Sequence, residues 1–298
     1  MLKEKLVLLG SFRSGSTNIS QAQAFRNIGW EVVEYDLVSR LKHLRSPAAR
    51  DEEIFQTCAF EEPRMVLISK GAGISRECIQ RLKKITCTVL WYMDPLDDNW
   101  NPELRERITC SDITVCALLK PFELARKLNP NSFFVHEGYD SAVDFPIQQR
   151  RKWDVSFIGQ TKGRRRLYQV ATGFKVIRGA FGTDHARAVG QSKINLNFVV
   201  NDSGCSDRVY KILAAGGFLL TEDWPGRSQD FKDGKDLVIF EGISDLDSKI
   251  REYLKDPWKR SAIANRGRET VQQFSREAYA EKISELVSEH IAKRILQQ

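Results

Sequence analysis

The stretch "SDRVYKILAAGGFLLTEDWPG", residues 206–226, joins a short amphipathic helix to a buried strand through two glycines. The helix is expected to begin near Ser206, to carry Arg208 and Lys211 in its first turns, and to end before Gly216 and Gly217. Glycine commonly ends helices in a left-handed conformation and permits close packing of the next segment. The apolar residues 218–221 then read as a strand. A helix that leads at once into a buried strand is typical of parallel α/β sheets.

The same alternation of strands and helices runs along the whole chain. Short buried strands separated by helical spacing indicate βαβ units and a parallel sheet. The pattern breaks once, in the polar, turn-prone segment around 138–153, and a chain of 298 residues is near the upper limit for a single core. We therefore expect two doubly wound α/β domains facing each other across a cleft, 1–147 and 148–275. The expected strands are 5–10, 30–37, 63–71, 86–95, 110–117 and 131–140, then 154–160, 174–182, 193–200, 216–222 and 236–242.

Composition narrows the class of partner. The formal net charge of +7 suits anionic partners such as nucleotides, phosphosugars or nucleic acid, although a basic surface can also serve solubility alone. The six cysteines are scattered without a Cys-x-x-Cys pair, and the four histidines lie far apart, so no metal site is expected. The N-terminal apolar run is too short for a secretory leader and no apolar run is long enough to span a membrane, which predicts a cytoplasmic protein.

Ligands of open α/β sheets bind beyond the carboxyl ends of the strands, so the loops after strands are the candidate sites. The first is "GSFRSGST", residues 10–17, with Ser11, Arg13, Gly15 and Ser16. It looks like a phosphate-binding loop in which Ser16 replaces the lysine, which argues against a kinase or ATPase. It is also similar to the sulfate-donor loop of sulfotransferases, and a plain glycine-rich turn remains an alternative.

Two further loops bring cations to the second domain. "QQRRKWDVSFIGQTKGRRR", residues 148–166, holds seven cations, and Gly159 ends its strand where a backbone can approach a ligand. Arg164 and Arg165 follow and could bind phosphate oxygens. The third candidate is the helix start at Ser206, where free amides and the helix dipole would meet a diphosphate beside Arg208. A basic, solvated helix start is the alternative for the second loop.

Several motifs in sequence order carry a family resemblance. "SKINLNFVVNDSGCSDRVYKILAAGGFLLTEDWPG" (192–226) and "FKDGKDLVIFEGISDLDSKIREYLKDPWKRSAIANRGRETV" (231–271) resemble the C-terminal domain of GT-B glycosyltransferases, within the group-1-like, spore-maturation (CgeB-type) branch. The resemblance implies two Rossmann-like domains, an acceptor side in 1–147, a donor domain in 148–275, and a C-terminal helix, 276–298, that crosses back toward the first domain. It implies transfer of a sugar from a nucleotide diphosphate sugar, with UDP as the expected nucleotide, and no required metal or other cofactor.

One departure from that family concerns the donor site. The broader retaining families use two glutamates separated by seven residues, and this chain has Ser203 and Lys211 at those positions. Lys211 cannot accept hydrogen bonds from ribose hydroxyls but could contact phosphate. The alternative is a decayed donor site in a non-catalytic nucleotide-sugar-binding protein. The choice between retention and inversion stays open.

Asp94 in "WYMDP" is the candidate general base, because it lies at the end of a predicted strand, and His136 in "VHEGYD" is an alternative. Asp94 could instead cap the turn before Pro95, and Asp140 and His185 are further candidates. The acceptor is not encoded in any motif; the positive charge permits a nucleic acid, for example a modified DNA base. The leading interpretation is a metal-independent glycosyltransferase, and the alternative from another class is a sulfotransferase. The oligomeric state is not encoded either.

Overall fold

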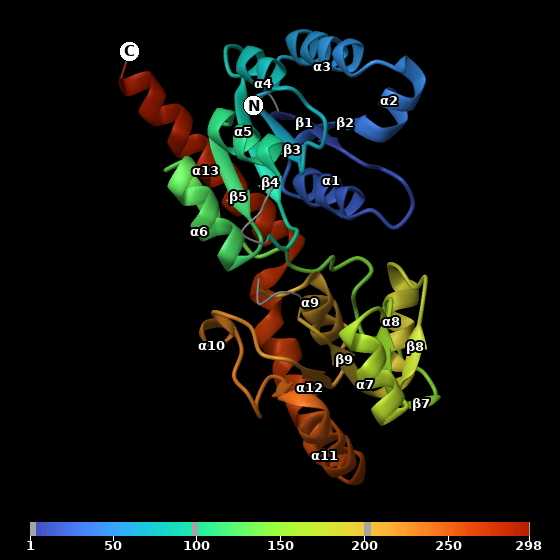
Figure 1. The fold of residues 1–298 in the computed structure, drawn as a ribbon. Coiled ribbons are helices and arrows are strands. Elements are labelled where there is room, and N and C mark those ends of the chain that lie inside the picture. Colours follow the sequence, from blue (N-terminus) through green and yellow to red (C-terminus); the bar gives the residue numbers. More distant parts are fainter. Residues whose placement is uncertain (1–3, 97–100, 200–203, 298) are drawn as a thin grey trace. The chain divides into compact units, whose positions relative to one another are not determined.

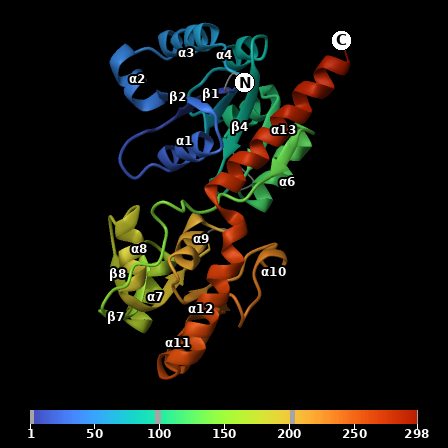
Figure 2. The same cartoon turned by 180° about the vertical axis from the view of Figure 1, so that it is seen from behind.

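The computed structural model describes residues 4–96, 101–199 and 204–297, shown in Figures 1 and 2. The chain forms two compact units: unit 1 comprises Met1–His136 and Arg276–Gln298, and unit 2 comprises Glu137–Ser275. The boundary between these compact units lies between residues 136 and 137, and the domain boundary predicted from the sequence lies between 147 and 148. The polar segment is held by unit 2: Tyr139 forms a bridge with Ser275, and a Cβ at Gly190 would lie 2.6 Å from the Ile147 carbonyl oxygen.

Unit 1 is built on a six-stranded parallel sheet in the order β2-β1-β3-β4-β5-β6. The order reverses between β1 and β3, which is where open sheets of this type bind ligands. The strands are β1 (Lys5–Gly10), β2 (Glu31–Asp36), β3 (Met65–Ser69), β4 (Cys87–Tyr92), β5 (Ile113–Cys116) and β6 (Ser132–Phe134).

Helices cover both faces of this sheet because alternate side chains of its strands point to opposite sides. Leu6 and Leu8 pack with α1 and α13, whereas Val7 and Leu9 pack with the helices of the other face. Figure 2 shows α13 running along unit 1 close to β4 and α6. The helices are α1 (Thr17–Asn27), α2 (Leu37–Leu44), α3 (Pro47–Glu61), α4 (Arg76–Leu82), α5 (Pro102–Cys110), α6 (Leu119–Leu128) and α13 (Arg276–Leu296).

Unit 2 repeats the architecture with a five-stranded parallel sheet in the order β11-β10-β9-β7-β8. Its order reverses between β7 and β9. The strands are β7 (Trp153–Ile158), β8 (Lys175–Ile177), β9 (Ser192–Asn197), β10 (Leu219–Thr221) and β11 (Val238–Ile239). The helices are α7 (Arg164–Thr172), α8 (Thr183–Gly190), α9 (Asp207–Ala214), α10 (Arg227–Asp230), α11 (Gly242–Lys255) and α12 (Pro257–Val271), followed by a 3₁₀ turn (Gln272–Phe274).

The two glycines after α9 have separate tasks. Gly216 takes a left-handed φ of 71° as the chain leaves the helix. A Cβ at Gly217 would lie 2.5 Å from Val189 Cγ1 and 2.9 Å from Ile212 Cγ2, so only glycine fits between α8 and α9. The close packing expected from the sequence is confirmed, and it fixes α9 against the sheet. Among the described residues, no helix has both the length and the apolar content needed to cross a bilayer.

Candidate functional site

A pocket of about 310 Å³ in unit 2 opens where its strand order reverses. Three segments form it: the loop after β7, the loop after β8, and the first turns of α9. All three are segments at carboxyl ends of strands or at a helix N-terminus, the places where α/β sheets bind anionic ligands. The lining residues are Ile158, Gly159, Gln160, Arg178, Gly179, Ala180, Phe181, His185, Asp207, Arg208 and Lys211.

Arg208 is fixed in this pocket by its own hydrogen bonds. Its Nε donates to the Ile158 carbonyl oxygen at 2.8 Å and its Nη1 donates to Asn197 Oδ1 at 3.0 Å, while the guanidinium lies 4.8 Å from the Phe157 ring centroid. Burial lowers the pKa of Arg208, yet an arginine stays charged. Within the described part of the chain no carboxylate forms an ion pair with it. The pocket thus holds an oriented positive charge.

Gly159 gives the loop after β7 its close approach to Arg208. Its φ of 148° lies in the region that favours glycine, and a Cβ there would be 3.2 Å from Arg208 Nη2 and 3.0 Å from Phe157 Cζ. A side chain would therefore press on the guanidinium and narrow the entrance. The expectation that this glycine lets the backbone approach a ligand stays a prediction.

The start of α9 carries a compensated pair of charges. Lys211 Nζ lies 2.5 Å from Asp207 Oδ2, so the Lys211 charge expected to contact phosphate is shared with a carboxylate. Ser206 precedes the helix and its hydroxyl donates to Asn197 Oδ1 at 3.1 Å, the same oxygen that Arg208 uses. Ser203, the second departure from the resembled family, lies outside the described residues.

His185 supplies a neutral polar group to the pocket. It is buried, and burial followed by the charge of Lys211 lowers its pKa to about 3. Its Nδ1 has no hydrogen-bond partner among the described residues. A buried ring nitrogen without a partner costs free energy, which a ligand hydroxyl or amide could recover.

Sequence reasoning missed two residues of the pocket. Arg178 and Phe181 follow β8, and both side chains are exposed beside the pocket. In the described part of the chain, Arg178 has no ion pair. The sequence carries a signal for a loop here, because "RGAFG" places Gly179 and Gly182 on either side of Phe181, but the expected strand 174–182 includes this stretch.

The two other arginines expected at the donor site are engaged elsewhere in unit 2. Arg164 Nη2 donates to Glu222 Oε2 at 2.8 Å and to the Val199 carbonyl oxygen at 3.0 Å, which ties α7 to the end of β10. Arg165 lies 5.6 Å from the Phe157 ring centroid, and burial lowers its pKa. Neither lines the pocket. Glu222 is far away in sequence, so no local pattern could reveal its pairing with Arg164.

The candidates for acid–base catalysis lie in unit 1. Asp94 follows β4 and forms an ion pair with Lys70, whose Nζ is 2.6 Å from Asp94 Oδ2. His136 follows β6 and meets the Phe134 ring edge-on, with centroids 4.8 Å apart. Asp140, the further candidate, belongs to unit 2 and accepts from the Ala142 amide at 3.0 Å.

The amides of the loop after β1 are bound by side chains of α1 and of the end of β2. Asn18 Oδ1 accepts from the Ser11 amide at 3.0 Å and Asp36 Oδ2 accepts from the Phe12 amide at 3.0 Å. Ser16 caps α1 by accepting from the Asn18 amide, and Gly15 has a φ of 82°. The remaining residue of this loop motif, Arg13, accepts from the Ser16 amide through its carbonyl. These bonds occupy the Ser11 and Phe12 amides, which a phosphate-binding loop would direct at its ligand.

Comparisons with known proteins agree with this fold. Residues 146–288 match a family described as glycosyl transferase-like. HepE of Anabaena, in a complex with UDP and glucose, has a similar structure, with a TM-score of 0.71, 11% identity, and coverage of 96% of this chain and 100% of that chain. Sucrose-phosphate synthase of Thermosynechococcus elongatus gives a TM-score of 0.69 at 11% identity, over 98% and 100% of the two chains.

A third similar structure is an alpha-glucosyltransferase in complex with UDP-glucose and DNA containing an abasic site. It gives a TM-score of 0.65 at 9% identity and covers 96% of this chain and 99% of that chain. No curated protein matches the chain. The chain therefore has the GT-B fold expected from its sequence, and its residues 146–288 are similar to the glycosyl transferase-like family.

Proposed function

We propose that this chain is a glycosyltransferase that takes its sugar from a UDP-sugar bound in the pocket of unit 2. The observation that carries the proposal is Arg208, a fixed guanidinium at the N-terminus of α9 that no carboxylate of the described chain pairs with. Together with Arg178 and the first amides of α9, it offers positive charge to a diphosphate. The similar structures of HepE and the alpha-glucosyltransferase contain UDP or UDP-glucose, which supports UDP as the nucleotide.

These residues would act on the leaving group. As the bond from the sugar to the diphosphate breaks, negative charge grows on the diphosphate oxygens, and fixed cations stabilise that charge without reorganising. Phe181 offers an exposed ring for stacking on the base, and His185 Nδ1 offers a neutral hydrogen-bonding group. Arg164, Arg165 and Lys211 would act indirectly, by positioning the pocket. No metal or other cofactor is part of the proposal.

On the acceptor side we assign unit 1. Asp94 is the proposed general base, and its ion pair with Lys70 would have to open before it takes a proton from an acceptor hydroxyl. His136 is the second candidate. DNA is the first acceptor to test, because one similar structure holds both UDP-glucose and DNA and because the chain carries a net charge of +7. The motifs around Arg208 and Gly267 favour the CgeB-type branch of the family. Because all six cysteines are buried and free, the reducing cytoplasm is the favoured location of the protein.

The test is a thermal-shift and calorimetry panel of UDP, GDP, ADP, CDP and dTDP sugars with wild type, Arg208→Ala and Arg178→Ala. Each arginine should contribute a charged hydrogen bond, about 1.5–3 kcal/mol, so each variant should bind the UDP-sugar at least ten-fold more weakly. Arg178 is exposed and unpaired in the described chain, so its loss should not unfold unit 2. Arg166→Ala is the matched control, since Arg166 is exposed in the same basic stretch but does not line the pocket.

Other outcomes would lead elsewhere. Stabilisation by adenosine 3',5'-bisphosphate alone would favour the sulfotransferase alternative. Tight UDP-sugar binding without turnover on any acceptor would favour a non-catalytic binding protein. Wild-type affinity in both Arg178→Ala and Arg208→Ala would overturn the site assignment.

A further inference from the structure

A second pocket, of about 530 Å³, lies in unit 1 at the opposite edge of its sheet from the loop after β1. Its residues come from the amino-terminal ends of strands and from two helix ends. Asp112 directly precedes β5, Asn131 directly precedes β6, and Lys83 caps the end of α4. The last turns of α13 complete it. The lining residues are Lys83, Lys84, Asp112, Asn131, His290, Lys293, Arg294 and Gln297.

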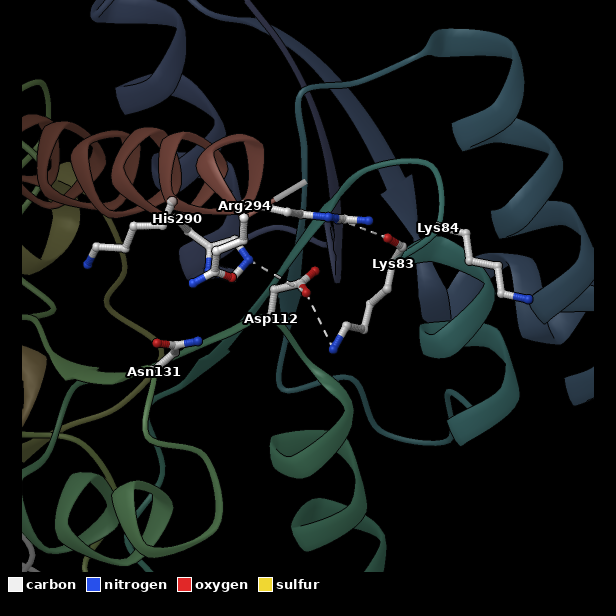
Figure 3. Close-up of a pocket in the computed structure, with 8 residues that line it drawn as sticks. Lys83, Lys84, Asp112, Asn131, His290 and Arg294 are labelled. Carbon is white, nitrogen blue, oxygen red and sulfur yellow. Dashed lines mark hydrogen bonds and ion pairs between the residues drawn. The ribbon is translucent and has the colours of Figure 1, made fainter.

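The charges in this pocket do not balance. Four cations line it against one carboxylate, Asp112, whose Oδ1 is 3.3 Å from Lys83 Nζ and 3.7 Å from His290 Nε2. Figure 3 shows Lys83 and His290 both turned toward Asp112. Within the described chain the other three cations, Lys84, Lys293 and Arg294, have no carboxylate partner. Like charges gathered around one recess raise the local positive potential and attract anions.

The arrangement argues against a metal ion. Cys87, Asp112 and His290 offer ligand atoms within 4.8 Å of one another, so a divalent cation is the obvious rival. Burial, and secondarily the charge of Asp112, raises the pKa of the Cys87 thiol to about 12, so forming the thiolate that a metal ligand needs costs free energy. Asp112 Oδ2 already accepts from the Thr88 amide and hydroxyl, both at 2.9 Å. A cation would also enter a recess with a surplus of positive charge.

We propose that this pocket binds a small anion with two or more phosphoryl groups. Lys83 and His290 are anchored on Asp112 at its floor, and Arg294, which donates to the Lys83 carbonyl oxygen at 3.3 Å, is held beside them. Lys84 extends away from Asp112 in Figure 3, and its exposed chain can turn to meet a bound phosphoryl group. The side-chain amide of Asn131 adds an uncharged hydrogen-bond donor. A recess of this size suits a small molecule better than a nucleic acid backbone, which needs an extended basic surface.

The first experiment is a lysine footprint of the intact chain with inorganic pyrophosphate as the probe. Acetylation by a water-soluble ester, followed site by site with mass spectrometry, should slow at least three-fold at Lys84 and Lys293 when pyrophosphate is present. Lys127, exposed on α6 of the same unit, is the internal control and should not change. Unchanged acetylation of Lys84 and Lys293 at pyrophosphate concentrations up to 10 mM would overturn the proposal.

The second experiment compares Lys84→Ala/Lys293→Ala with Lys127→Ala by calorimetry at physiological salt. Pyrophosphate can also bind near Arg208, so all chains carry Arg208→Ala to remove that contribution. Affinity should fall at least ten-fold in the double variant and stay unchanged in the control. If the cations only balance the dipoles of α4 and α13, the double variant will lose thermal stability without losing pyrophosphate affinity.

Two further arms decide between the proposal and its rivals. If zinc raises the thermal stability of the chain and Cys87→Ser removes this effect, the pocket is a metal site and the anion proposal is wrong. The last outcome concerns a single-stranded nucleic acid of twenty nucleotides. If it binds through Lys84 and Lys293 and pyrophosphate does not bind, the pocket is part of a nucleic-acid-binding surface and the proposal is wrong. The proposal is independent of the donor pocket, because its residues all belong to unit 1.

Discussion

His185, which lines the pocket that we propose as the donor site, makes the stability of unit 2 depend on pH. Its folded pKa of about 3 lies below the value of about 6.5 expected in an unfolded chain, so between these values the unfolded state binds a proton that the folded state does not. This contribution to the free energy of unfolding is therefore complete above pH about 6.5 and is lost as the pH falls toward 3. From pH 6.5 to 4.5 the loss should be about 2–3 kcal/mol.

Urea unfolding at several pH values measures this loss. His185→Gln should have a shallower dependence on pH than wild type, whatever its stability at pH 7. His43→Gln, an exposed histidine on α2, is the matched control and should keep the wild-type dependence. Parallel pH profiles for wild type and His185→Gln would show that the ring is not held neutral by burial.

Lys211 and Asp207 make a second prediction for a single residue. The ion pair cancels most of the Lys211 charge toward a ligand, so Lys211→Met should weaken UDP binding less than Arg178→Ala does. Lys211→Met also leaves the Asp207 carboxylate without this ion pair beside the diphosphate, so we expect a loss of about three-fold. Calorimetry with UDP checks the order of the two variants. A larger loss in Lys211→Met would mean that Lys211 leaves Asp207 when the ligand binds.

At the scale of elements, α12 packs on α9 through Gly267. A Cβ on Gly267 would lie 2.2 Å from the Asp236 carbonyl oxygen and 2.8 Å from Leu213 Cδ2 of α9. Replacing glycine by alanine inside an exposed helix usually adds up to about 1 kcal/mol of stability. Here Gly267→Ala should instead cost about 1–3 kcal/mol, since backbone has to shift.

Chemical denaturation of Gly267→Ala and Ser261→Ala tests the close approach. Ser261 lies on the same helix with its side chain exposed, so its replacement by alanine should leave stability unchanged or raise it slightly. If Gly267→Ala leaves the free energy of unfolding unchanged or raises it, Gly267 does not approach the Asp236 carbonyl oxygen this closely.

The strands were predictable and some helices were not, for a physical reason. All eleven expected strand segments contain a strand, because buried parallel strands are continuous apolar runs. The sequence predicts no helix at several places where the structure has one, among them α2, α3 and α5. In α3 the buried residues include Arg50 and Asp51, and Asp51 Oδ2 accepts from the Ser75 amide at 3.0 Å. When charged residues occupy the buried positions of a helix, the regular spacing of apolar residues that identifies a helix in a sequence is lost. The sequence of such a helix then resembles that of a loop.

At the scale of the whole molecule, the chain leaves unit 1 at His136 and returns to it at Arg276. Sequence patterns singled out Gly159, Arg208 and Lys211, which line the pocket of unit 2, and Ser206, which does not. They did so because ligand sites follow strands in doubly wound sheets. They could not separate Arg208 from Arg164, because that distinction depends on partners far away in sequence. They also did not predict the second pocket, in unit 1. Its residues come from the segments that precede β5 and β6, from the end of α4 and from α13.

The six buried cysteines report on the two units separately. Cys205 is the one cysteine of unit 2, and the other five belong to unit 1; the structure describes all six, and none forms a disulfide. Burial raises the pKa of Cys58, Cys78 and Cys116 to about 12, so thiols should react only after local or global unfolding. Each unit has its own cores, so each should unfold as its own cooperative body.

Site-resolved alkylation in moderate urea, with and without a UDP-sugar, should therefore distinguish the units. A ligand at 100 times its dissociation constant adds about 2.7 kcal/mol to the unit that binds it, which corresponds to about 100-fold slower labelling of Cys205. The cysteines of unit 1 should label at unchanged rates, and Arg178→Ala should weaken the protection of Cys205. If the ligand slows alkylation equally at all six thiols, the two units unfold together. If it slows alkylation only in unit 1, the nucleotide binds to unit 1 and the assignment of the site to unit 2 is wrong.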